Sequence, residues 1–210
     1  LNKEEFNQTC EKFEVVISVY SDEEKVDKLK DRNLGIHSED DYYNRLDELL
    51  SELNYFAIKL PINLIERNFI SLLFFQRLSD YFQITEDEKN NDPNDFQQYM
   101  LETALKIIYN CATRSQKLSK AIIDYGILIK IQKNIDYYND ICKHVCYSIF
   151  SVFFHNKYEV GQVYFRDFVK NLAEKFITEE NYDLDELKTS QISELLFSFN
   201  GYGVVHDDEE

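Results

Sequence analysis

The amino-acid sequence predicts an all-α protein built from one repeated helical unit, and three observations support this prediction. The chain of 210 residues contains only 5 Gly and 2 Pro, too few for the frequent turns of an all-β fold. Leu, Ile and Phe recur at helical spacing, with Lys and Glu between them. The spacing of one apolar helix face also returns along the chain, which is typical of repeat proteins. Because 44% of the residues are hydrophobic, the chain can bury a core, and we expect almost no strand.

The N-terminal segment, residues 1–20, predicts one helix that belongs to a partial repeat. Phe13, Val16 and Tyr20 share a face of a helix that begins near Phe6. The charged residues 21–41 that follow predict a loop or a marginal helix.

Helical segments then succeed one another to residue 199. A helix over 42–60 ends before Pro61, because the residue before a proline is pushed away from helical geometry. A short helix or turn is expected at 63–68, and further helices are expected at 69–84, 96–112, 116–125, 127–135, 139–154, 158–165, 166–176 and 184–199. The polar residues 85–95 predict an acidic insertion, and residues 200–210 predict an acidic tail.

One apolar face recurs in the three long helices. Leu101, Leu105, Ile108 and Ala112 are separated by steps of 4, 3 and 4 residues. The same steps separate the members of two other sets, namely Leu46, Leu50, Leu53, Ala57 and Cys142, Cys146, Ile149, Phe153. Each set is followed by a short helix and an apolar helix. The sequence therefore predicts copies at 42–82, 96–135 and 139–176, and a partial copy at 184–199.

The segment AIIDYGILIKI, residues 121–131, resembles the junction between the first and second helices of an armadillo repeat. In that family a short first helix ends in Gly, and Gly126 fits because the bend needs a residue without a β-carbon. Phe69 and Asp167 stand at the aligned positions of the other copies, which can equally have HEAT geometry. The resemblance covers most of residues 42–199 and implies a right-handed α-solenoid of armadillo/HEAT-like repeats with a concave binding groove.

The resemblance also implies where a partner would bind. Asn110 occupies the place of the ladder asparagine with which importin-α-type armadillo proteins hydrogen-bond the backbone of an extended peptide. The tryptophan one turn earlier in that family is Lys106 here, and the chain contains no Trp, which is a departure from the pattern for nuclear import signals. Tyr55 and Ser151 are the equivalents of Asn110 in the neighbouring copies.

An aromatic surface on the long helices is the alternative binding surface, since aromatic residues are enriched at interface hot spots. Its candidate members are Tyr55, Phe56, Tyr99, Tyr109, Tyr147, Phe150 and Phe154, each of which can instead pack against the next repeat. We therefore expect a partner to contact Asn110, Tyr109, Lys106, Tyr55, Ser151 and Tyr147.

The charge and the cysteine content limit the classes of partner and of compartment. A net charge of -16 disfavours direct nucleic-acid binding and favours a basic protein partner, or else it only keeps the chain in solution. No apolar run reaches the roughly 18 residues that span a bilayer. Four cysteines without a signal-peptide pattern indicate reduced thiols in the cytoplasm or nucleus.

No pattern in the sequence indicates catalysis, so we expect no enzyme, cofactor or metal. Cys142, His144 and Cys146 form the sharpest candidate for a metal site, but 144 points away from the face that 142 and 146 share. The expected function is a protein-interaction scaffold or adaptor within a larger complex. The alternatives are an exchange factor or co-chaperone that regulates a nucleotide-switch protein, and a structural subunit of a larger complex.

Overall fold

The computed structural model of the chain describes residues 3–20, 22–71, 73–82, 95–156, 158, 162–178, 190 and 192–199. These residues form helices and the turns between them, and none of them lies in a strand. The prediction of an all-helical fold is therefore confirmed for this part of the chain. The chain divides into two compact units, Leu1–Ile127 and Leu128–Glu210. Residues 85–94 of the predicted insertion, residues 184–189 of the partial copy and the predicted tail lie outside the described ranges.

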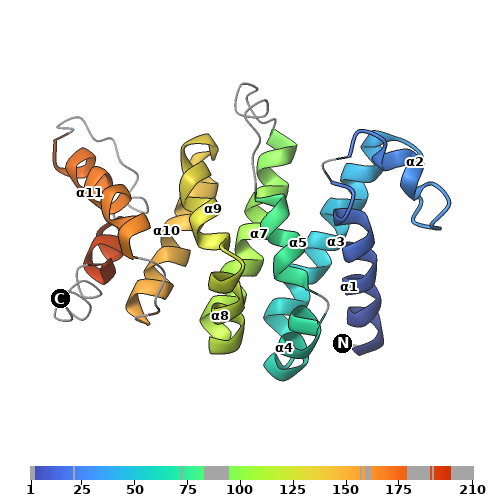
Figure 1. Cartoon of the computed structure of the whole chain (residues 1–210), viewed down its shortest axis with the longest axis horizontal. Helices are drawn as coiled ribbons and strands as arrows, with labels where there is room; N and C mark the ends of the chain where they lie inside the picture. Colours follow the sequence, from blue (N-terminus) through green and yellow to red (C-terminus); the bar gives the residue numbers. More distant parts are fainter. Residues whose placement is uncertain are drawn as a thin grey trace. The chain divides into compact units, whose positions relative to one another are not determined.

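The first unit contains seven helices within its described residues, and α9 begins at its last residue (Figure 1). They are α1 Lys3–Ile17, α2 Lys25–Leu29, α3 Glu39–Lys59, α4 Ile62–Ser71, α5 Phe74–Tyr81, α7 Asp95–Arg114 and α8 Gln116–Asp124. The charged segment 21–41, for which the sequence predicts either a loop or a marginal helix, contains the short helix α2.

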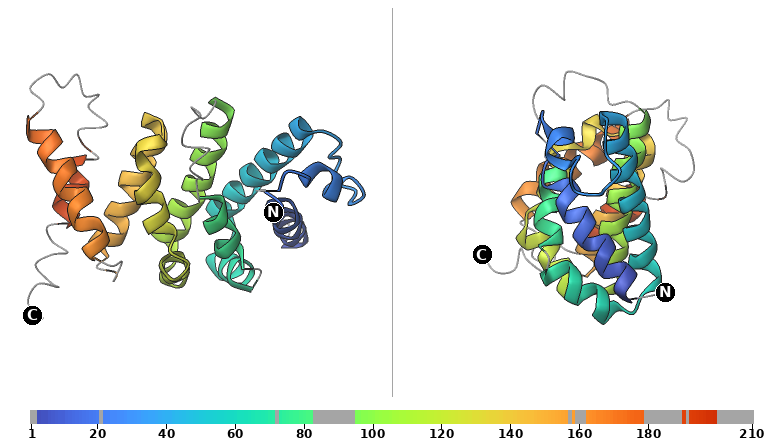
Figure 2. Two further views of the ribbon diagram at one scale, coloured as in Figure 1. Left: turned by 45° about the horizontal axis from the view of Figure 1, so that its top comes forward. Right: turned by 90° about the vertical axis from the view of Figure 1, so that its right-hand side faces the viewer.

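Equivalent helices of the first unit pack side by side. The long helix α3 lies between α1 and α7, while α4 packs against α5 and α8 (Figures 1 and 2). Since α3 and α7 are each followed by a short helix, this pairing places long helix against long helix and short helix against short helix. These helices belong to the segments 42–82 and 96–135, which the sequence predicts to be two copies of one unit.

The core follows the 4-3-4 spacing. Leu46, Leu50, Leu53 and Ala57 of α3 are buried, and so are Leu105, Ile108 and Ala112 of α7. Leu101 is half-buried. Aromatic rings extend this core to α4 and α5, where Phe69 and Phe74 stack with ring centroids 4.0 Å apart.

The break between α4 and α5 differs from the prediction. The sequence alignment placed it at Phe69, but α4 continues to Ser71, and Phe69 is a buried helical residue. The chain instead turns at Leu73, whose φ of 53° is left-handed. Gly126 turns the chain after α8 with a φ of 67°. Leu73, and not Phe69, is thus the conformational equivalent of Gly126.

The second unit contains the rest of α9 (Ile127–Asn134), the 3₁₀ turn η1 Ile135–Tyr137, α10 Asp140–His155, α11 Gln162–Thr178 and a helical stretch at 192–199. Cys142, Cys146, Ile149 and Phe153 are buried, so the predicted apolar face of α10 is confirmed. The two helices predicted at 158–165 and 166–176 are wrong, because α11 is one continuous helix through Asp167. The segment predicted as the third copy, 139–176, therefore has no break at the position aligned with Gly126.

Candidate functional site

Four of the six predicted contact residues lie on the paired helices α3 and α7. Here the term "α3–α7 face" means Asn54 and Tyr55 of α3 together with Tyr99, Lys106, Tyr109 and Asn110 of α7. Tyr55 is 51% exposed, Tyr99 52% and Tyr109 36%, so three aromatic rings remain accessible on a surface whose other side forms the core. Aromatic rings that stay exposed on a folded domain are suited to partner contacts.

Asn110 lies at the seam of this face. Its Nδ2 donates a hydrogen bond to Oδ1 of Asn54 across the helix pair, with 3.0 Å between the two atoms. A side-chain amide has two N–H groups and two acceptor lone pairs, so one such bond uses only a part of what each amide offers. The bond orients both amides across the α3–α7 pair. The sequence did not predict Asn54 as a site residue, because its hydrogen-bond partner Asn110 lies 56 residues away in sequence.

Lys106, one turn before Asn110, forms an ion pair with Glu102 of the same helix. The distance between Nζ and Oε1 is 2.5 Å, and the lysine side chain remains 48% exposed. Glu102 is 17% exposed, but pairs at i, i+4 spacing on one helix contribute little to stability, so the lysine can exchange its partner at low cost.

The other two predicted contact residues are buried. Tyr147 is 6% exposed and Ser151 is 4% exposed, so the prediction that their side chains offer a surface on α10 is wrong for this structure. Phe56, Phe150 and Phe154 are buried as well, and of the aromatic candidates only Tyr55, Tyr99 and Tyr109 are exposed. The face is thus limited to the first unit.

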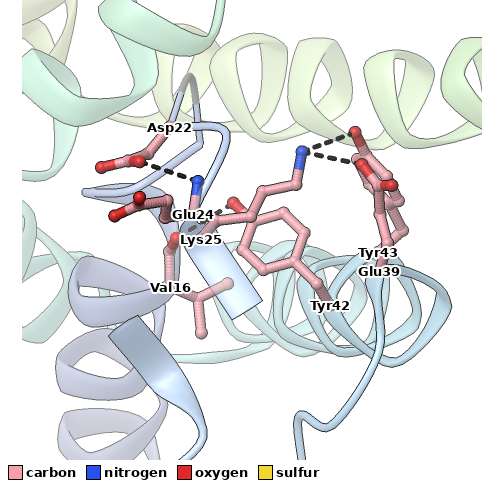
Figure 3. A network of polar contacts seen from close by, with 7 residues as sticks. All are labelled: Val16, Asp22, Glu24, Lys25, Glu39, Tyr42 and Tyr43. Carbon is pink, nitrogen blue, oxygen red and sulfur yellow. Dashed lines mark hydrogen bonds and ion pairs between the residues drawn. The ribbon is translucent and has the colours of Figure 1, made fainter. Parts of the chain in front are cut away.

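A second polar cluster surrounds Lys25 of α2 (Figure 3). Its Nζ lies 3.0 Å from Oε1 of Glu39 and donates to the hydroxyl of Tyr43 at 3.1 Å. The same ammonium lies 5.4 Å and 4.9 Å from the ring centroids of Tyr42 and Tyr43, within the range of cation–π attraction. Burial by itself lowers the pKa of Lys25, but the hydrogen bonds with Tyr43 and Glu39 outweigh it, so the pKa is raised.

The contacts around Lys25 hold the charged segment 21–41 against α1 and α3. Tyr42 is buried and donates its hydroxyl hydrogen to the carbonyl of Val16 in α1 at 3.0 Å (Figure 3). The lysine side chain is only 12% exposed, and its ammonium is already surrounded by the two tyrosines and Glu39. The arrangement is therefore that of a structural tie between α1, α2 and α3.

The cysteines are core residues. All four lie in described parts of the chain, all are buried, and none forms a disulfide bond. Burial raises the pKa of Cys10 to about 12 and raises that of Cys146 well above its ordinary value, which keeps these thiols protonated. Within the described ranges no three His, Cys, Asp or Glu side chains come together in a way that could hold a metal ion.

Comparison with protein-family models, with curated proteins and with solved structures found no match. Among the helices that the structure describes, none is both long and apolar enough to cross a lipid bilayer.

Proposed function

We propose that this protein is a non-enzymatic interaction scaffold that binds an extended segment of a partner protein on the α3–α7 face. The observation that carries the proposal is that the exposed Tyr55 and Tyr109 are the sequence neighbours of the hydrogen-bonded Asn54 and Asn110, with the exposed Tyr99 about three turns earlier on α7. The rings supply apolar contact area, and the amides supply donors and acceptors for a peptide backbone. The stacking of two helical copies supports the further proposal of a right-handed armadillo/HEAT-like solenoid.

The proposed partner segment is basic. The chain carries 39 acidic and 23 basic residues, a balance that attracts cationic partners over long range. The exposed carboxylates of Glu52 and Glu48 lie on α3, one and two turns before Tyr55 respectively. A scaffold of this kind would act in the cytoplasm or nucleus, and the lack of any disulfide bond among four buried cysteines supports a reducing compartment.

The test compares two tyrosines of equal exposure. Tyr109 on the face is 36% exposed, and Tyr125 at the end of α8 is 37% exposed. Partners should be captured from an extract of the native cells with the wild type, with Tyr55→Ala/Tyr109→Ala and with Tyr125→Ala, and identified by mass spectrometry. We expect at least one partner whose captured amount is about tenfold or more lower with the double variant than with the wild type. The reason is that hot-spot aromatic residues each contribute on the order of 1–2 kcal/mol. Tyr125→Ala should retain it, and helical circular dichroism should be the same for all three.

Equal capture by all three proteins would contradict the assignment of binding to the α3–α7 face.

A second candidate function is that of a structural subunit that contacts its complex through the helical stretch 192–199. One observation favours it. Phe197 is 79% exposed there, more than any other large hydrophobic residue among those described. A Phe197→Ser variant in the same experiment separates the two, because only the structural-subunit proposal expects it to lose partners.

A further inference from the structure

A group of cations gathers where α3 leads into α4 and α7 leads into α8 (Figure 1). The term "basic corner" here means Lys59, Arg67, Arg114, Lys117 and Lys120, all of which are exposed. The helices α4 and α8 and the junctions before them contain two acidic residues, Glu66 and Asp124, the second of which is exposed one turn after Lys120. Five cations against two anions are still a local excess of positive charge in a chain whose net charge is -16.

Contacts of α7 and α8 with α3 and α4 place these cations at two neighbouring junctions of the first unit. The Arg114 guanidinium donates to the carbonyl of Ala57 and, at 2.8 Å, to the carbonyl of Leu60, so it lies beside Lys59 at the end of α3. Glu66 of α4 accepts a 2.6 Å hydrogen bond from the Ser115 hydroxyl, and its other oxygen lies 3.5 Å from Nζ of Lys117. Arg67 follows Glu66 in sequence, and Lys120 is one turn after Lys117. The packing of α3 on α7 and of α4 on α8 therefore creates the corner.

Two of the five cations interact with other groups of the protein, and three make no ion pair within the described residues. Arg114 caps the carbonyl end of α3, and Lys117 pairs with Glu66. Lys59, Arg67 and Lys120 make no ion pair within the described part of the chain. Two large apolar side chains lie next to them, since Ile58 precedes Lys59, and Ile70 is one turn from Arg67 on α4. Each isoleucine is 45% exposed.

We propose that the basic corner is a second docking surface, which binds an acidic protein segment that also carries apolar side chains. Charge complementarity selects the acidic segment, and Ile58 and Ile70 provide the adjoining apolar contacts. This proposal does not depend on the α3–α7 face, whose proposed partner is basic. A nucleic acid fits less well, because its long polyanion would run from five cations onto an acidic surface.

The experiment measures binding of a fluorescein-labelled peptide of alternating glutamate and leucine to the full chain by fluorescence anisotropy. The same peptide with every glutamate changed to glutamine is the first control. The variant Lys59→Glu/Arg67→Glu/Lys120→Glu should bind the acidic peptide about tenfold more weakly than the wild type, as three exposed charge pairs predict. Binding of the wild type should also weaken as NaCl is raised, because the pairs are exposed.

The matched control is Lys12→Glu/Arg32→Glu/Lys133→Glu, which changes the net charge equally at exposed positions outside the corner. It should bind the acidic peptide within about twofold of the wild type. If the reversed variant loses its helical circular dichroism, Lys59→Gln/Arg67→Gln/Lys120→Gln replaces it, with about threefold weaker binding expected. The proposal is overturned by any of three results: no binding of the acidic peptide by the wild type, equal losses in both variants, or tighter binding of a single-stranded RNA than of the peptide.

Discussion

At the scale of single residues, Ser38 and Asp41 determine where α3 begins. The Ser38 hydroxyl accepts a hydrogen bond from the backbone N–H of Asp41, and Oδ2 of Asp41 accepts one from the backbone N–H of His37, each at 3.1 Å. The pattern resembles a capping box, except that Asp41 accepts from the N–H of His37, the residue before the N-cap Ser38. The hydrogen bond with Ser38 and that with the His37 N–H lower the pKa of Asp41.

The lowered pKa makes the contribution of Asp41 dependent on pH. Because the folded-state pKa is below the unfolded value of about 3.9, the stabilisation is fully present above that pH and is lost as the pH falls through the folded pKa. We expect Asp41→Asn to lower the urea midpoint at pH 7 more than Asp40→Asn, which removes an exposed carboxylate from the same turn. The difference between the two variants should shrink as the pH falls below about 3.9 and disappear once the pH is below the folded-state pKa of Asp41. A difference that persists unchanged in acid would show that the Asp41 charge has no part in the cap.

At the scale of elements, the junctions between helices show two ways to turn the chain. Gly126 adopts its positive φ without steric cost, whereas Leu73 adopts nearly the same φ with a β-carbon. The left-handed conformation costs a residue with a β-carbon roughly 1–2 kcal/mol. Leu73 is 43% exposed, so its side chain recovers only part of this cost by burial.

Leu73→Gly should therefore stabilise the protein. Relief of the left-handed strain outweighs the extra chain entropy of glycine, and the expected net gain is up to about 1 kcal/mol in the free energy of unfolding. Ile70→Gly is the matched control, because Ile70 is 45% exposed but lies inside α4, where glycine costs about 1 kcal/mol. Urea denaturation monitored by circular dichroism measures both. A loss of stability in Leu73→Gly would mean that the Leu73 side chain contributes more by contact than its backbone costs.

These junctions also mark how far the sequence could predict the structure. The faces of α3, α7 and α10 were predictable because helical periodicity is local, and their spaced Leu, Ile and Cys residues are indeed buried. The turn at Leu73 was not predictable, because a leucine gives no sequence signal for a left-handed backbone conformation. The continuity of α11 through Asp167 was missed for a related reason, since the alignment imposed a junction where the local sequence has no breaker.

The candidate site was predictable to a similar degree. The armadillo resemblance and the alignment of the copies selected Asn110, Tyr55 and Ser151, and the aromatic residues of the long helices added Tyr109 and Tyr147. The structure has Tyr55, Tyr109 and Asn110 exposed or half-buried, whereas Ser151 and Tyr147 are buried. Which outward position stays open depends on what packs over it, and this information is not local. The Asn54–Asn110 bond likewise depends on the register between two helices.

At the scale of the whole molecule, the charge is unevenly distributed. The basic corner concentrates five cations, while the chain as a whole has 16 more acidic than basic residues. Ion pairs within the described residues, such as Arg45–Glu48 and Lys106–Glu102, each have one partner that is well exposed and lie within one helix, so they contribute little each. Repulsion among the excess carboxylates is therefore the larger electrostatic effect on folding stability.

Salt should consequently stabilise this protein at neutral pH. Raising NaCl from about 20 mM to about 300 mM shortens the Debye length severalfold and screens the repulsion. We expect the midpoint of thermal unfolding to rise by about 2–4 °C, which corresponds to about 1 kcal/mol for a chain of this size. The same titration near pH 4.7, where the net charge is close to zero, is the control and should give a much smaller rise. A midpoint that falls with salt at pH 7 would mean that favourable ion pairs, including those of the basic corner, outweigh the net repulsion.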